Sequence, residues 1–138
     1  MTEQNGLETV VLEPQGAHRA TLIWLHGLGA DGYDFVPIVR ELNLPQELGV
    51  RFVFPHAPQR RVTVNGGFRM RAWYDVRYPD LSVAVDEAGV WESVEAVLAL
   101  AEQEQAQLGG WDKVMLAGFS QGGAITLQAG LSSGYPFA

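Results

Sequence analysis

The sequence contains no cysteine, few basic residues and no long apolar run. The absence of cysteine excludes disulfides, thiolate nucleophiles and cysteine metal ligands. Nine Lys and Arg stand against 16 Asp and Glu, which gives a formal net charge of −7. This balance argues against nucleic-acid binding, which depends on basic patches. No stretch approaches the roughly 20 apolar residues that span a bilayer, so we expect no membrane span.

What is present fits one domain. A length of 138 residues with 47% hydrophobic residues suits a single globular unit over residues 1–138. The first ten residues lack the basic start and apolar stretch of a signal peptide. We therefore expect a cytoplasmic protein.

Short apolar runs predict the strands. The runs 21–25, 51–54 and 114–117 are almost wholly apolar, as is typical of strands buried on both faces of a parallel sheet. A shorter run at 9–12 suggests an edge strand. The segments 62–64 and 68–70 flank Asn65-Gly66-Gly67, a hairpin turn signal.

Helical spacing of apolar residues separates these runs. It predicts helices at 33–42, at 87–107 with Asp86 as N-cap, and from Gly122 to Gln128. The expected core face of the longest helix is Val90, Trp91, Val94, Val97, Leu98 and Ala101. Strands that alternate with helices predict an α/β fold, with a mostly parallel sheet, flanking helices and a small β-hairpin.

The segment from Gly118 to Gly122 reads Gly-Phe-Ser-Gln-Gly and matches the pattern G-x-S-x-G. An apolar strand precedes it and a helix follows, which is the context that the nucleophile turn of serine hydrolases requires. Glycines allow so sharp a turn, and the helix N-terminus offers free N–H groups to a developing oxyanion. Ser120 is therefore the candidate nucleophile. The alternative is a glycine-rich turn whose serine only caps the helix.

A second glycine-rich loop follows the strand at 21–25. Gly27, Gly29 and Gly32 match the dinucleotide-binding pattern G-x-G-x-x-G, but the next strand ends without the carboxylate that would hold a ribose. The alternative is an oxyanion loop, with the N–H of Leu28 acting together with that of Gln121. Only this second interpretation also accounts for Ser120.

With both loops considered, the sequence resembles the carboxylesterase and acyl-protein thioesterase (phospholipase/carboxylesterase) family of α/β-hydrolases. The resemblance rests on LHGLGADGYDF at 25–35, FPHAPQRRVTVNGGFRMRAWYD at 54–75 and LAGFSQGGA at 116–124. It implies Ser120 as nucleophile, Leu28 and Gln121 as oxyanion donors, and Trp73 beside the substrate pocket. It further implies an acyl ester or thioester substrate, acylated proteins included, and no cofactor.

One feature departs from that family. Its triad runs in the order Ser, Asp or Glu, His, and the 18 residues after Ser120 contain no Asp, Glu or His. We therefore expect the N-terminal half of an α/β-hydrolase, C-terminally incomplete and weakly active or inactive alone. An inactive fragment or binding module is the alternative. Because strand 114–117 would lack a neighbour, we expect a homo-oligomer or pairing with a C-terminal fragment.

Other polar residues are candidates of lower rank. His26 is either a base for Ser120 or a brace for the oxyanion loop, and His56 is expected to be structural. The three histidines show no metal-binding spacing, so we expect no metal. Five arginines gather in the hairpin region, where they form a solvated face or attract acidic substrates; they are Arg60, Arg61, Arg69, Arg71 and Arg77.

Overall fold

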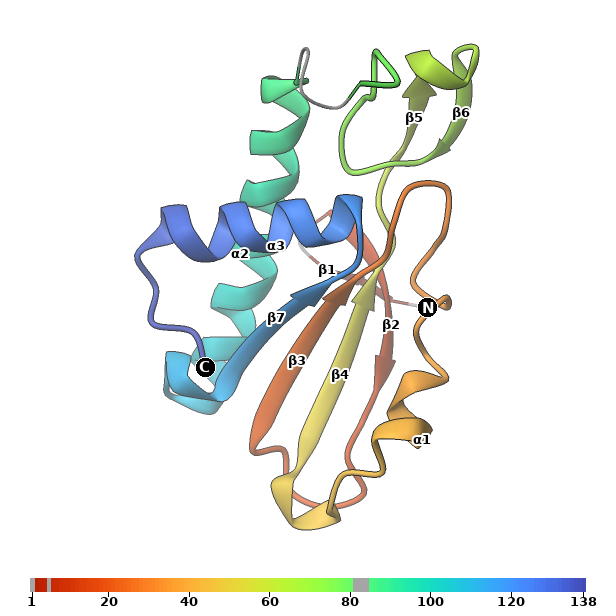
Figure 1. Ribbon diagram of the computed structural model, residues 1–138. Helices are drawn as coiled ribbons and strands as arrows, with labels where there is room; N and C mark the ends of the chain where they lie inside the picture. Colours follow the sequence, from red (N-terminus) through yellow and green to blue (C-terminus); the bar gives the residue numbers. More distant parts are fainter. Residues whose placement is uncertain (1, 5, 81–84) are drawn as a thin grey trace.

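A five-stranded sheet forms the centre of the computed structural model, which describes residues 2–4, 6–80 and 85–138. Its spatial order is β1-β2-β4-β3-β7 (Figure 1). The strands are β1 (Thr2–Gln4), β2 (Leu7–Leu12), β3 (Ala20–Leu25), β4 (Val50–Pro55) and β7 (Val114–Gly118). The central strands β4, β3 and β7 are parallel, whereas β2 joins β4 antiparallel. The predicted α/β class and its four apolar strands are confirmed.

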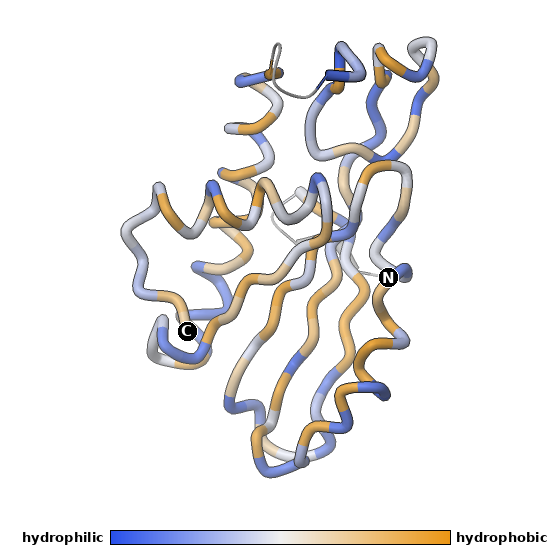
Figure 2. Tube along the Cα trace, viewed as in Figure 1, coloured by the Kyte–Doolittle hydropathy of each residue, from blue (hydrophilic) through white to orange (hydrophobic). Residues whose placement is uncertain are grey.

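Two helices cover one face of the sheet. They are α2 (Glu87–Leu108) and α3 (Gln121–Ser133), which lie against each other in Figure 1. Ile23 pairs with Val53 on one side and Leu116 on the other; Ile23 and Val53 are buried in the core, and the partly buried Leu116 packs against it. Figure 2 shows β3, β4 and β7 as largely hydrophobic, which agrees with the apolar runs that predicted them.

The helix predicted at 33–42 is shorter than its apolar spacing suggested. Only α1 (Ile38–Leu42) is helical, and turns closed by Asp34 N–H to Asp31 O and Val36 N–H to Tyr33 O precede it. Proline disfavours helical backbone in the residue before it. Pro37 therefore delays the helix start, and α1 begins directly after it.

The predicted hairpin is present with a displaced first strand. β5 (Gln59–Val62) pairs with β6 (Phe68–Arg71), and the 3₁₀ turn Thr63–Asn65 occupies most of the segment predicted as strand 62–64. Gly66 and Gly67 have φ values of 70° and 75°, which glycine adopts freely. Two further 3₁₀ turns occur at Gln46–Leu48 and Trp111–Lys113.

The long helix α2 confirms its predicted start and corrects its predicted face. The Asp86 side chain accepts from the Gly89 N–H at 3.1 Å, as expected of an N-cap. Trp91, predicted to be core, is 47% exposed. The buried stripe instead includes Ser93 and Glu104, so two polar side chains occupy positions that the apolar pattern alone could not reveal.

Candidate active site

Ser120 stands at a sharp turn between β7 and α3. Its backbone has φ 55° and ψ −118°, a conformation that L residues rarely adopt. Such strain costs about 1–3 kcal/mol and persists only where the surrounding structure forces it. The Ser120 side chain is exposed and makes no capping hydrogen bond to α3. The alternative in which this serine only caps the helix is therefore wrong.

The two glycines of the motif make this turn possible. A Cβ on Gly118 would lie 2.4 Å from Gly122 O, and one on Gly122 would lie 2.4 Å from Leu25 O. Both distances are far below van der Waals contact, and the opposing atoms are backbone. The helix start consequently rests directly on the end of β3.

The loop after β3 lies beside the serine. A Cβ on Gly27 would be 3.5 Å from Ser120 Cβ, so the loop and the turn are in contact. Within the described residues the Leu28 N–H donates to no acceptor, while the Gly29 N–H donates to Arg71 O at 2.9 Å. The Gln121 N–H belongs to the first residue of α3, where a helix leaves its amides without intrahelical partners. Two uncommitted N–H groups thus lie on the two segments that meet at Ser120.

Comparison with known proteins identifies the family of the chain. The sequence model of the phospholipase/carboxylesterase family matches residues 7–138. The chain belongs to this family.

Named relatives within this family are thioesterases and carboxylesterases. The chain is 37% identical over 123 residues to "Acyl-protein thioesterase 1" of Yarrowia lipolytica, covering 88% of this chain and 54% of the relative. It is 40% identical over 113 residues to "Carboxylesterase SOBER1" of Arabidopsis thaliana, covering 79% and 49%. The crystal structure of Zea mays acyl-protein thioesterase 2 superposes with a TM-score of 0.75 at 35% identity, covering 88% of this chain and 50% of that one. The chain therefore spans about half the length of the relatives it matches.

The dinucleotide alternative lacks the helix it needs. In that fingerprint a helix opens directly at the glycine-rich loop and receives the pyrophosphate. Here turns follow Gly32, and α1 begins only at Ile38.

His26 braces the glycine-rich loop that follows β3, as one of the two interpretations of this residue expected. Its Nδ1–H donates to Gly27 O at 2.7 Å, and its Nε2 accepts the Ala57 N–H at 2.9 Å. Both ring nitrogens are thereby used, and the ring is 1% exposed. The imidazole holds the loop against the end of β4 and has no nitrogen left for Ser120.

The other two histidines are also engaged. His56 Nδ1 accepts the Gly32 N–H at 2.9 Å, and His18 Nε2 lies 2.7 Å from Thr21 Oγ1. His56 Nε2 is buried and bonds no group in the described structure. None of the three histidines, all of which the structure describes, is hydrogen-bonded to Ser120. His56 supports the far end of the glycine-rich loop, at Gly32, which agrees with the structural role predicted for it.

Both loop histidines are held neutral. Burial lowers the pKa of the His26 imidazole below its ordinary value. Burial, then the Arg71 charge, lowers the pKa of His56 in the same direction. Each ring accepts an N–H bond through a nitrogen lone pair, which protonation would remove. The folded state thus binds fewer protons than the unfolded state near the ordinary histidine pKa.

We expect the free energy of unfolding to fall as the pH drops below about 6.5. The stabilisation is fully present above the unfolded pKa and is lost as pH falls toward the lowered folded pKa, at most about 1.4 kcal/mol per pH unit for each histidine. Urea unfolding at pH values between 7.5 and 5 measures this loss of stability. His56→Asn keeps an acceptor near the Nδ1 position without titrating, so it should flatten the profile. An unchanged profile in this variant would contradict the assignment.

Trp73 lies beneath the site. It is 0% exposed, and its indole Nε1–H donates to His26 O at 2.9 Å. No part of the side chain reaches the surface in this chain, so contact with substrate stays a prediction from the family resemblance alone.

The hairpin arginines bond within the protein. Four of them donate to backbone carbonyls, and Arg77 pairs with Asp75 and Asp86 at 3.7 and 3.6 Å. This arrangement favours a structural hairpin face over an anion-attracting one. Among the described residues, no group of three potential metal ligands comes together, and no helix has the length and apolar character to cross a bilayer.

Sequence reasoning missed the side chain of Gln121. It is 5% exposed and bonds the backbone of Trp73 and Tyr74. These partners lie 48 and 47 positions away in the sequence, and no local pattern marks the connection.

Proposed function

We propose that the protein to which this chain belongs hydrolyses carboxylic esters or thioesters, with Ser120 as nucleophile and the N–H groups of Leu28 and Gln121 as oxyanion donors. The observation that carries the proposal is the strained Ser120 backbone, at φ 55° and ψ −118°. A strained serine at a strand-to-helix turn, whose hydroxyl makes no hydrogen bond to the helix N-terminus, fits the nucleophile of an α/β-hydrolase. The names of the thioesterase and carboxylesterase relatives support the same substrate class.

The reaction proceeds in two steps. Ser120 Oγ attacks the carbonyl carbon, its proton passes to a base, and the alcohol or thiol departs with that proton. Water then attacks the acyl-serine ester and releases the carboxylic acid. The carbonyl oxygen becomes negative in both steps, where one N–H donor is worth about 10²–10³ in kcat. The second donor, Gln121, adds the positive end of the α3 dipole.

The base and its orienting acid come from residues other than those described. No histidine of the chain is hydrogen-bonded to Ser120. The chain alone retains the nucleophile and the oxyanion donors, which leave about 10³–10⁴ of catalysis over water. We further propose that the substrates include acylated proteins and that the protein acts in the cytoplasm.

The edge strand β7 supports association with another polypeptide. Among described strands it pairs with β3 alone, and the apolar side chains of Phe119, Leu127 and Leu131 nearby are 58%, 66% and 84% exposed. Unpaired strand edges recruit further strands. A second copy or a C-terminal hydrolase segment would fill this edge, and light scattering on dilute chain detects either complex. A monodisperse, cooperatively folded monomer would contradict this part of the proposal.

The nucleophile assignment is tested by covalent labelling and by turnover. A fluorophosphonate should label Ser120. The 138-residue chain should hydrolyse p-nitrophenyl acetate slowly, and the Ser120→Ala variant should lose this activity. Ser132→Ala is the matched control, because Ser132 is exposed on the same helix and bonds only Gln128 O at 2.6 Å. Equal rates in parent and Ser120→Ala would overturn the nucleophile assignment. Turnover by the 138-residue chain near that of a complete esterase would overturn the missing base.

A further inference from the structure

Trp73 connects the two segments that carry the oxyanion donors. It is the largest fully buried side chain described. Its backbone N–H donates to Gln121 Oε1 at 2.7 Å, and its indole Nε1–H donates to His26 O at 2.9 Å. One residue thus bonds the first residue of α3 and the first residue of the loop that presents Leu28.

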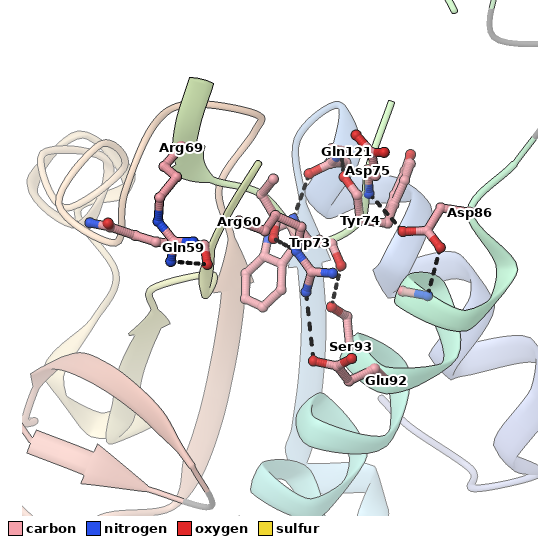
Figure 3. Close-up of polar contacts among 12 residues, drawn as sticks. Gln59, Arg60, Arg69, Trp73, Tyr74, Asp75, Asp86, Glu92, Ser93 and Gln121 are labelled. Atoms are coloured by element: carbon pink, nitrogen blue, oxygen red, sulfur yellow. Dashed lines mark hydrogen bonds and ion pairs between the residues drawn. The ribbon is translucent and has the colours of Figure 1, made fainter. Parts of the chain in front are cut away.

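Gln121 fixes the helix side of this connection. Besides accepting from Trp73, its Nε2 donates to Tyr74 O at 2.8 Å. Figure 3 shows the Gln121 side chain lying against the Trp73–Tyr74 backbone, with Ser93 bonding Trp73 O from α2. A buried amide with both ends bonded has one orientation, so the same contacts also orient the Gln121 backbone N–H.

The loop side is fixed on both flanks of Leu28. The Trp73 indole holds the carbonyl of His26, two residues before Leu28, and Arg71 O accepts the Gly29 N–H at 2.9 Å immediately after it. The His26 and Trp73 rings lie 5.4 Å apart, in contact range. The short segment from Arg71 to Trp73 therefore anchors the loop while leaving the Leu28 N–H uncommitted.

We propose that Trp73 is a positioning residue, whose indole N–H sets the separation between the Leu28 and Gln121 N–H groups. The proposal rests on the proposed function, since it gives these two amides a shared oxyanion. Donors must lie about 2.7–3.1 Å from that oxygen to act. Trp73 is sealed in the core, its backbone N–H is bonded to Gln121 and its indole N–H to His26, and such a rigid residue holds this distance better than a flexible side chain does. A core tryptophan without this role would matter through its volume and not through its N–H.

The decisive variant removes the N–H and keeps the volume. Replacement of Trp73 by 3-benzothienylalanine puts sulfur in place of the indole N–H, and Trp73→Phe is the simpler second variant. Steady-state kinetics with p-nitrophenyl acetate are measured on protein expressed from the complete coding sequence, per titrated Ser120. We expect kcat to fall about 10- to 100-fold while KM stays within about threefold, because a displacement of about 1 Å costs up to 10²-fold in the transition state.

Trp24→Phe is the matched control. Trp24 lies on β3, two residues before His26, and its buried Nε1 bonds no group in the described structure. It should leave kcat within about twofold, because the change removes no hydrogen bond. Equal losses from Trp24→Phe and from the Trp73 isostere would overturn the proposal, as would an unchanged kcat in the isostere.

A second readout does not depend on turnover. In ¹H–¹⁵N spectra of the 138-residue chain, the Trp73 isostere should displace the amide resonances of Leu28 and Gln121, and Trp24→Phe should leave both in place. Unmoved resonances in the isostere would overturn the positioning role. If Ser120→Ala leaves turnover unchanged, the proposed function fails, and these resonances still decide whether Trp73 holds the two amides.

Discussion

Replacing Gly122 with alanine is expected to abolish labelling of Ser120 and to destabilise the fold. The new Cβ would lie 2.4 Å from both His26 O and Leu25 O. These atoms belong to the central strand β3 and to the oxyanion loop, so neither can rotate away as a side chain would. α3 must move outward, which strains the Phe119 N–H bond to Leu25 O, now 3.0 Å. Overpacking in a well-packed core costs about 1–3 kcal/mol, and backbone clashes lie at the upper end.

Gly130→Ala provides the matched control for this change. Gly130 lies in the same helix, and a Cβ there would meet nothing within 4 Å. Alanine in a helix interior is favoured over glycine by about 0.8–1 kcal/mol, so this variant should be slightly more stable and label normally. Urea unfolding and fluorophosphonate labelling compare the two. A Gly122→Ala protein as stable and as reactive as the parent would refute the close-approach role.

The sequence predicted the elements that depend on local patterns. The apolar runs at 21–25, 51–54 and 114–117 became adjacent parallel strands because residues apolar on both faces have few other places in a fold. The turn at Ser120 was predictable because its motif lies within five consecutive residues, although the close approach that requires Gly122 is to the distant residues Leu25 and His26.

The features that depend on tertiary contacts were not predictable. Apolar spacing suggested a helix from 33, but Pro37 and its preceding residue favour turns there. Trp91 follows the helical spacing of apolar residues but is not buried. The buried face of α2 includes Ser93 and Glu104 instead. The side chain of Gln121 finds partners 47 and 48 residues away. Such long-range polar contacts leave no periodic trace in a single sequence.

Glu104 is the clearest of these hidden residues. It is 0% exposed on α2, and its carboxylate bonds the Arg51 guanidinium and accepts from Thr21 Oγ1 at 2.9 Å. Arg51 also pairs with Glu13 at 3.1 Å, and His18 bonds the Thr21 hydroxyl. The carboxylate therefore links α2 to the beginnings of β3 and β4. A buried charge is tolerated only when it is paired and hydrogen-bonded, which this one is.

Glu104→Ala should cost about 3–5 kcal/mol, because it leaves Arg51, 12% exposed, without its buried partner. Total stabilities of small domains are about 5–15 kcal/mol, so this loss is a large fraction of the total, and urea unfolding at low temperature measures it best. Glu102→Ala, an exposed glutamate on the same helix, should change stability by less than about 0.5 kcal/mol. The double variant Glu104→Leu with Arg51→Met removes both charges and should recover most of the loss. If it is no more stable than Glu104→Ala, neither the unpaired arginine nor the cavity is the cause, because the double variant removes the first and fills the second.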